Sequence, residues 1–493
     1  MTGGRDARLP SVAGLSVAGA ALLALVARHY PIDAPGACCV EPSLRGYLPY
    51  GALFLVGVAL LTWAWLRSDR LRTTRARVLA GGLAAHLVML CGLPFLSLDS
   101  LYYEAIGRAM ALGHDPHRPL SEALSPTSSL AQLLPPAWRT GTTPYLAGFN
   151  RLSETVARLT GSDVARALHL YQLLGMAAIF LCAALVGRAV LIRAGETAAA
   201  RAAALILFCP LSLVEATLNG HNDALLAIPV ALFALATLEK RRLLGVLALA
   251  SGLLVKASAL LLLGMELSRL ALARLGRLVT PARVLAVGAA GAAALLTAYF
   301  VLHDRVPALV SVAALVGRPA DLYEHCTRSP ECLPRALLRY VFHRNTAAWA
   351  LGLVFRAASA VWLFYAAGRA ARAEGTDEQD SPLVWLATGL FIYYLCFHGF
   401  MQSWYLLSLL PLLPFADRRL LPFMKLFLVC AVAYYAIDLP LQNATNPVEV
   451  GIRELGGAVI ADGVTLFLLI GVWLRAQSRK SAMRASVAPR RFQ

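Results

Sequence analysis

Apolar stretches long enough to cross a bilayer recur along the whole of this 493-residue chain. Hydrophobic residues make up 58% of it, and the mean hydropathy is +0.64. A membrane helix needs about 20 predominantly apolar residues, and only the polar segment 98–165 approaches the length of an independent soluble domain. The sequence therefore predicts an all-α, polytopic transmembrane helical bundle that forms one unit over residues 1–475.

About 13–14 spans are expected, and our own count gives fourteen. The run Leu243 to Leu270 is bounded by basic residues at both ends, so we interpret it as a hairpin of two short helices turning near Lys256. The first run, Val12 to Val26, lacks a clear cleavage site and is interpreted as a retained helix. The other predicted spans are 11–29, 46–66, 78–98, 166–187, 202–218, 223–238, 282–302, 346–367, 382–398, 403–416, 420–437 and 458–474.

The net charge of +17 is carried by short loops between the apolar runs. Such clusters mark the cytoplasmic side of a membrane protein and argue against nucleic acid as the partner. With these loops inside, both termini are cytoplasmic, and 476–493 is a basic cytoplasmic tail. The long segments 98–165, 303–345 and 438–457 then lie outside the cytoplasm, and we expect a bacterial inner membrane protein with its active face on that side. The basic segments are Arg67 to Arg77, Arg188 to Arg201, Lys240 to Arg242, Arg269 to Arg283, Arg369 to Arg372, and Arg418 with Arg419.

Asp99 stands where the apolar run Val78 to Leu98 meets the polar segment. An acid at such a boundary ionises at little cost and faces a region that lipid-borne substrates reach. The alternative interpretation is an acid that only marks the interface.

The segment that follows Asp99 has the character of a binding loop. It holds Asp115 and the aromatic side chains of Tyr102, Tyr103 and Tyr145, whose flat faces suit sugar surfaces. An interfacial aromatic belt explains such residues equally well, and we favour that explanation for Trp138.

Three further polar groups fall at the same predicted face. The turn Asn219-Gly220-His221-Asn222-Asp223 is more polar than a simple turn requires, although Asp223 also suits the helix N-cap. Lys256 is flanked by apolar residues, and snorkelling towards the cytoplasm does not explain it at an outward-facing tip, whereas an anionic partner does. The last group joins two spans and contains His398, Gln402, Trp404 and Tyr405.

An acid, two histidines, a lysine and amide side chains at one face suit sugar transfer from a lipid-phosphate donor. Asp99 would act as the general base towards the attacking hydroxyl, while Lys256, His221 and His398 stabilise the leaving phosphate. The residues expected to bind substrate are Tyr102, Tyr103, Asp115, Tyr145, Asn219, Asn222, Asp223, Gln402, Trp404 and Tyr405. No spacing of cysteine and histidine indicates a zinc site, and no nucleotide-binding motif has a credible context, so we expect no cofactor and no metal site.

These motifs occur in an order that resembles the polyprenol-phosphate-mannose-dependent α-1,6-mannosyltransferases of actinobacteria, which belong to the multi-pass glycosyltransferase class GT-C. The resemblance spans roughly 80 to 415, and Gly220-His221-Asn222-Asp223 is its most specific part. It implies a polyprenyl-phosphate donor, transfer of a hexose (mannose in this family), a glycan or glycolipid acceptor, inversion at the anomeric carbon, and Asp99 as catalytic base.

The chain departs from this family at two places. Many members carry two acids separated by one residue where this chain has Ser97 and Asp99. The element Thr143-Pro144-Tyr145 also lacks the following Gly-Pro of similar members. These differences leave the sugar and the acceptor open and weaken the expectation of metal dependence.

Two other functional classes remain open from the sequence. A transporter or flippase of lipid-linked sugars also places polar residues among many spans, but no internal repeat is found, and the polar residues gather at helix ends. A structural membrane subunit without catalysis would not need a lysine at the hairpin tip.

Overall fold

The computed structural model describes residues 8–29, 44–275, 345–373, 381–397 and 402–436, with single residues between 334 and 342 and between 459 and 471. The predicted spans 282–302 and 458–474 lie wholly or mostly outside the described residues. The same holds for the predicted outer segments 303–345 and 438–457 and for the basic tail 476–493.

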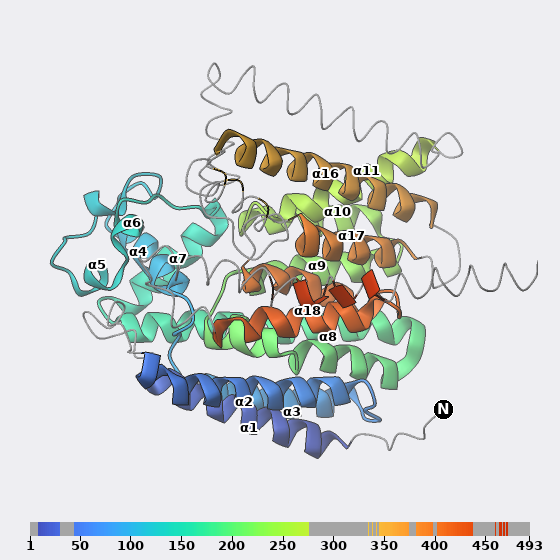
Figure 1. The fold of residues 1–493 in the computed structure, drawn as a ribbon, viewed down its shortest axis with the longest axis horizontal. Coiled ribbons are helices and arrows are strands. Elements are labelled where there is room, and N and C mark those ends of the chain that lie inside the picture. The colour runs from blue at the N-terminus through green and yellow to red at the C-terminus, as the bar shows by residue number, and fades with distance from the viewer. Residues whose placement is uncertain are drawn as a thin grey trace, which may run out of the picture.

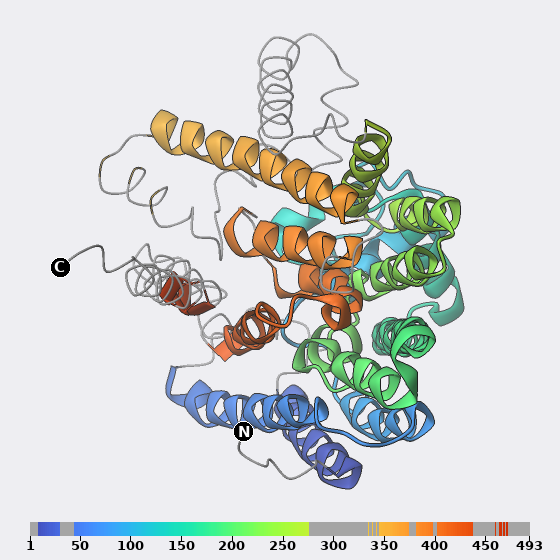
Figure 2. The same cartoon turned by 90° about the vertical axis from the view of Figure 1, so that its right-hand side faces the viewer.

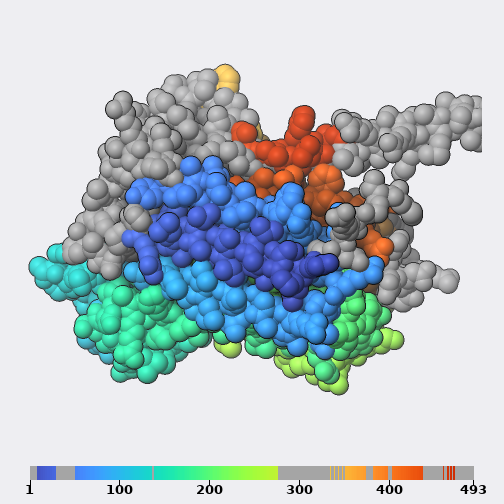
Figure 3. Space-filling view, turned by 90° about the horizontal axis from the view of Figure 1, so that it is seen from below, coloured from blue at the N-terminus to red at the C-terminus, as the bar shows by residue number. Residues whose placement is uncertain are grey.

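Every regular element of the described residues is a helix, which confirms the all-α fold class. In Figure 1 the long helices lie side by side, with α1, α2 and α3 along one face and α16 along the opposite face. Figure 2 shows the same layers after a quarter turn, and Figure 3 shows α1 to α3 lying across the outer surface. The bundle helices are α1 (Leu9–His29), α2 (Leu44–Ser68), α3 (Arg75–Met89), α8 (Val164–Leu207), α9 (Asp223–Leu238), α10 (Arg242–Ser251), α11 (Ala259–Leu275), α16 (Asn345–Arg372), α17 (Pro382–Cys396) and α18 (Leu421–Ala433).

Four of the described helices, α1, α2, α8 and α16, contain segments long and apolar enough to cross a membrane. Four shorter apolar helices, Asp223–Leu238, Arg242–Leu254, Pro382–Cys396 and Leu421–Ala433, pack among them. The chain is therefore a polytopic helical membrane protein. The expected total of fourteen spans stays a prediction, because part of the chain lies outside the described residues.

The long helix α8 folds back on itself. Its backbone leaves helical geometry at Gly195, where φ is 76°, and Gly187 before the break lies against Ala199 and Ala203 after it. Beyond Pro210 the chain forms the π-helix η3 (Ser212–Leu218), which returns to the level of Gly175. The predicted spans 166–187 and 202–218 thus form a tight antiparallel pair.

Two of the basic segments, Arg67 to Arg77 and Arg188 to Arg201, meet at one end of the bundle. There Arg75 pairs with Glu196 at 3.0 Å, Arg201 donates to the Leu71 carbonyl at 2.9 Å, and Lys425 pairs with Asp69. These contacts tie α2 and α3 to the turn of α8 and to α18. The turns that carry these two basic segments are consequently held to each other and to α18 by these contacts.

The predicted hairpin at Lys256 is confirmed. α10 ends at Ser251, a short 3₁₀ turn η4 (Gly252–Leu254) follows, and α11 begins at Ala259, so that Lys256 stands in the turn.

The predicted span 78–98 is wrong in its second half. α3 ends at Met89, and residues 90–98 are not helical. The cause is local, because Gly92 and Pro94 follow the last helical turn, and proline cannot continue a helix. Asp99 therefore begins a helix, α4, instead of ending a membrane helix.

The polar segment after Asp99 is a packed set of helices at the end opposite the basic segments, and we call residues 99–160 the cap (Figure 1). α4 and α7 pack closely on each other, and both contact α8. Gly107 permits this contact, since a Cβ there would lie 2.2 Å from the Ser153 carbonyl oxygen. The cap elements are α4 (Asp99–Ala111), η2 (Leu120–Glu122), α5 (Ser129–Leu133), α6 (Pro136–Arg139) and α7 (Ala147–Thr160).

We predict that Gly175→Ala destabilises the bundle. A Cβ at this position would lie 1.9 Å from the Ala216 carbonyl oxygen, so α8 and η3 have to move apart. Overpacking of this kind costs about 1–3 kcal/mol. Thermal unfolding of the detergent-solubilised protein measures it.

The control is Gly264→Ala on α11, where the new Cβ has no atom of the described residues within 4 Å. Its thermal stability should equal or exceed that of the parent protein, because alanine is the better helix former. Equal stability of the Gly175→Ala and Gly264→Ala variants would contradict the packing seen between α8 and η3.

Candidate active site

Asp99 lies at the N-terminus of α4, with its side chain 16% exposed. Its backbone N–H donates to the Ser97 hydroxyl at 3.2 Å. The partial positive charge at a helix N-terminus stabilises an ionised carboxylate. The start of α4 thus holds an acid that faces the junction of cap and bundle.

His221 is the central side chain of the site, and it is fully buried. Its Nδ1 lies 3.5 Å from Asp99 Oδ2 and 3.4 Å from the Tyr103 hydroxyl. Its ring stacks on Trp404, with the centroids 4.1 Å apart and the planes 13° apart. The turn Asn219 to Asp223 therefore places the His221 imidazole between α4 and the helix η8 (Ser403–Phe415).

Gly220 makes the turn possible. Its φ is +67°, a left-handed conformation that side chains with a Cβ rarely adopt, and a Cβ would lie 3.0 Å from the backbone of Tyr171 and Gln172. The Gln172 side-chain amide then donates to the Gly92 carbonyl at 2.8 Å and to the Leu218 carbonyl at 2.7 Å. One amide group on α8 thereby joins the segment that leads to Asp99 with the segment that leads to His221.

Glu215 is a member of the site that the sequence reasoning missed. It lies on the π-helix η3, is fully buried, and places Oε2 3.4 Å from His221 Nε2. The Asn219 amide donates to the same oxygen at 2.9 Å. A signal was present, because an acid within the apolar run 202–218 is itself a functional-site indicator in a membrane protein.

Lys256 finds its anionic partner within the protein. Its Nζ lies 2.7 Å from Asp223 Oδ2 and 4.2 Å from the centre of the Tyr405 ring. The side chain of Lys256 is 14% exposed, whereas that of Asp223 is 1% exposed. The need for a counter-charge is therefore met by Asp223, and Lys256 alone of this pair reaches the surface of the site.

The tyrosines of the cap pack against one another. Tyr103 donates to Asn222 Oδ1 at 3.3 Å and makes edge contacts with Tyr145 and Phe149, at centroid distances of 5.1 and 4.8 Å. Burial raises the pKa of both Tyr103 and Tyr145 well above the ordinary value, so both hydroxyls stay neutral. Tyr103 belongs to the site through its hydroxyl, while Tyr145 supports it from the cap.

Tyr102 and Trp138 pack within the cap. The Tyr102 hydroxyl donates to the Thr142 carbonyl at 2.9 Å, and the Tyr102 ring lies 5.1 Å from the Trp138 ring.

Helix α4 also carries the buried acid Glu104, whose carboxylate accepts a hydrogen bond from Arg108 at 2.7 Å. Burial nevertheless raises the pKa of Glu104 to about 7.

Asp115 is not gathered at this point. Asp115 is exposed in the cap, where its carboxylate accepts the His117 backbone N–H at 2.9 Å. Gln402 is partly exposed just before η8, and His398 lies outside the described residues.

We call Asp99, Glu215, His221, Asp223 and Lys256 the charged cluster. It contains three carboxylates against two groups that can be cationic. Among the described residues, no group of histidine, cysteine and acidic side chains is arranged to hold a metal ion. Several buried atoms of the cluster and its neighbours also have no hydrogen-bond partner in the described part of the chain, namely Glu215 Oε1, Asn219 Oδ1, His221 Nε2, Asn222 Nδ2 and Asp223 Oδ1.

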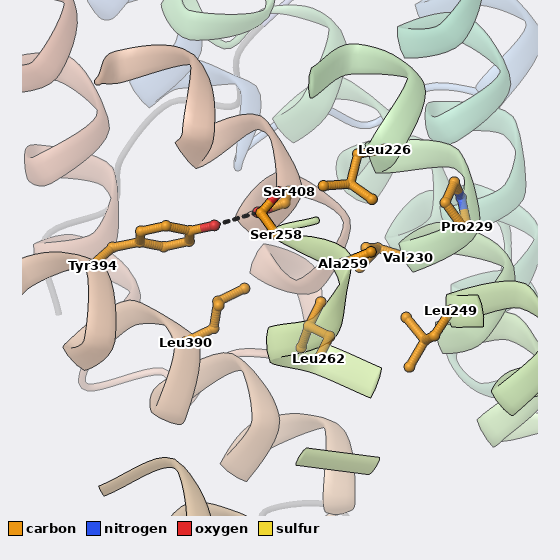
Figure 4. A pocket seen from close by; sticks show the side chains of 10 residues that line it. All are labelled: Leu226, Pro229, Val230, Leu249, Ser258, Ala259, Leu262, Leu390, Tyr394 and Ser408. Carbon is orange, nitrogen blue, oxygen red and sulfur yellow. Dashed lines mark hydrogen bonds between the residues drawn. The ribbon is translucent and has the colours of Figure 1, made fainter. Parts of the chain in front are cut away.

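A small, largely apolar pocket lies among α9, α10, α11, α17 and η8 (Figure 4). Its lining residues Leu226 and Ser258 follow Asp223 and Lys256 closely in the chain, and the Tyr394 hydroxyl lies 2.9 Å from the Ser408 hydroxyl at its edge.

A family model described as alpha-(1->6)-mannopyranosyltransferase, N-terminal domain, matches residues 9–274, which is more than half of the chain. The match includes the whole cap and every member of the charged cluster. No curated protein and no solved structure matches the chain.

Proposed function

This chain belongs to the alpha-(1->6)-mannopyranosyltransferase family, and we propose that it transfers mannose from a polyprenyl-phosphate donor to a glycan or glycolipid acceptor of the cell envelope, with inversion. The observation that carries the proposal is the exposure of the three carboxylates in the charged cluster. Glu215 is fully buried, Asp223 is 1% exposed, and Asp99 is 16% exposed at the mouth of the site. Asp99 is thus the carboxylate that an acceptor can reach.

In the proposed reaction the acceptor hydroxyl attacks the anomeric carbon from the face opposite the phosphate. Asp99 takes the hydroxyl proton as the new C–O bond forms, and the bond to the phosphate oxygen breaks. The electron pair leaves with the polyprenyl phosphate, and a single displacement inverts the anomeric centre. No metal is needed to balance this step.

Lys256 is the group we assign to the donor phosphate. Its ammonium has three protons, of which Asp223 uses one, and its side chain is partly exposed. Contact of the phosphate with His221 and with His398 stays a prediction, since His221 is buried and His398 lies outside the described residues.

Transfer is favoured over transport of a lipid-linked sugar. The family match favours transfer, and the five residues of the charged cluster lie together at the cap end of the bundle. We place this cluster on the extracytoplasmic side of a bacterial inner membrane, because the basic segments around Arg75 and Arg201 lie at the opposite end of the bundle. Basic loops are typical of the cytoplasmic side of a membrane protein.

We predict that Asp99→Asn abolishes transfer while expression and donor binding stay nearly intact. Loss of a general base costs roughly a hundred- to ten-thousand-fold in rate. The measurement is transfer of radiolabelled mannose from a polyprenyl-phosphate donor to membrane lipids. Glu122→Gln is the control, since Glu122 is an exposed acid of the same cap. Activity of the Asp99→Asn variant within about threefold of the parent would reject Asp99 as the base.

We predict that Lys256→Met weakens donor binding strongly, whereas Lys256→Arg retains part of it, because either cation neutralises a phosphate. Acceptor affinity should change little. Removal of Lys256 alone leaves Asp223 buried without its partner, which is destabilising. The double variant Lys256→Met/Asp223→Asn removes that penalty, and its donor affinity is measured on protein shown to be folded. Normal donor binding by the folded double variant would make the lysine purely structural.

We predict that the cap is extracytoplasmic and that the segment between α2 and α3 is cytoplasmic. Thr74 and Ser121 are exposed, so single cysteines placed there in a cysteine-free background report the two sides. A membrane-impermeant maleimide should label the Ser121→Cys variant on intact cells and the Thr74→Cys variant only after permeabilisation. The reverse pattern would contradict the proposed side of the active site.

A further inference from the structure

Glu215 is a buried acid placed behind His221, on the side away from Asp99. The two imidazole nitrogens face different carboxylates, Nδ1 towards Asp99 at 3.5 Å and Nε2 towards Glu215 at 3.4 Å. The stack on Trp404 at 4.1 Å prevents the ring from tilting. The ring is therefore held along a line between the exposed acid and the buried one.

We propose that Glu215 is a positioning residue for the transfer reaction, which holds the His221 imidazole so that its Nδ1–H points at Asp99 Oδ2. This inference rests on the proposed function. Asp99 Oδ2 is then occupied by His221, and Oδ1 is left to take the proton of the acceptor hydroxyl. Glu215 touches neither the acceptor nor the donor in this arrangement.

The surroundings of His221 support this role for Glu215. The side chains facing the imidazole are Asp99 and Tyr103 from α4, Glu215 from η3, Asp223 from α9 and Trp404 from η8. Asp223 is already engaged by Lys256, and the Tyr103 hydroxyl donates to Asn222.

Of the carboxylates around the imidazole, Glu215 is the one that faces Nε2, at 3.4 Å. Asn219 donates to Glu215 Oε2 at 2.9 Å and so fixes the oxygen that faces Nε2, and in the described residues neither Nε2 nor Glu215 Oε1 has a hydrogen-bond partner.

A double-mutant cycle tests whether Glu215 acts through His221. Glu215→Gln keeps the volume and the oxygen that accepts from Asn219, but removes the charge. We expect it to lower kcat by about ten- to a hundredfold while the KM for the donor changes little, since groups in one charged network are coupled. In the His221→Gln background the same change should cost less than about threefold, because the residue through which it acts is gone.

Two further variants make the outcome decisive. Glu215→Asp retains a carboxylate and should recover part of the activity lost in Glu215→Gln. Glu266→Gln removes an equally buried acid on α11, away from His221, and should leave kcat per folded molecule near that of the parent. Thermal unfolding of each variant normalises the rates to folded protein, and if Glu215→Gln does not fold, the kcat of Glu215→Asp is compared in the two His221 backgrounds.

Additive losses from Glu215→Gln and His221→Gln would overturn the inference, as would a normal kcat of folded Glu215→Gln. The Asp99→Asn variant separates this failure from failure of the proposed function. An inactive Asp99→Asn variant with additive losses rejects only the role of Glu215. An active Asp99→Asn variant rejects Asp99 as the base, and with it the reaction on which the inference rests.

Discussion

Pairing of buried charges is the constraint on which the arrangement of this site depends. Five ionisable side chains from α4, η3, the turn before α9, α9 itself and the α10–α11 hairpin lie where little water reaches them. An isolated charge in such surroundings costs several kcal/mol, so each group needs a partner on another element. The pair formed by Lys256 and Asp223 therefore fixes the hairpin to α9, and the pair formed by His221 and Asp99 fixes the turn to the cap.

Close backbone contact brings these elements within reach of one another. Gly107 brings α4 against α7, and Gly175 brings α8 against the π-helix that carries Glu215. Gln172 then binds the carbonyls of Gly92 and Leu218 with one amide group. The positions of Asp99 and His221 are thus set by the helix α8 between them more than by their own short segments.

The sequence predicts those features of the site that depend on local polarity. A turn as polar as Asn219 to Asp223 and a lysine at the tip of an apolar hairpin cannot lie in lipid, so their place at helix ends follows from composition alone. Family resemblance supplied Asp99 as the base. These elements converge in the structure, with His221 and Lys256 at the same end of the bundle as Asp99.

Features that depend on tertiary contact were not predictable in the same way. Apolar composition continues to Leu98, yet α3 ends at Met89, because Gly92 and Pro94 outweigh hydropathy. The polar segment was expected as a loop, but its aromatic residues form a packed helical cap around Tyr103. Glu215 lies within an apolar run of the sequence, which gives no sign of its contact with His221. That contact forms because η3 runs back along α8.

The excess of carboxylates in the charged cluster has a consequence for the proposed reaction. In the proposed reaction the bound donor phosphodiester carries one negative charge, which Lys256 neutralises in competition with Asp223. When the sugar departs, the phosphate acquires roughly one more negative charge. Lys256 then interacts more strongly with the leaving group than with the bound donor, and an interaction that strengthens towards the transition state raises kcat rather than affinity alone. Asp223 contributes to this difference by satisfying Lys256 until the phosphate becomes the stronger partner.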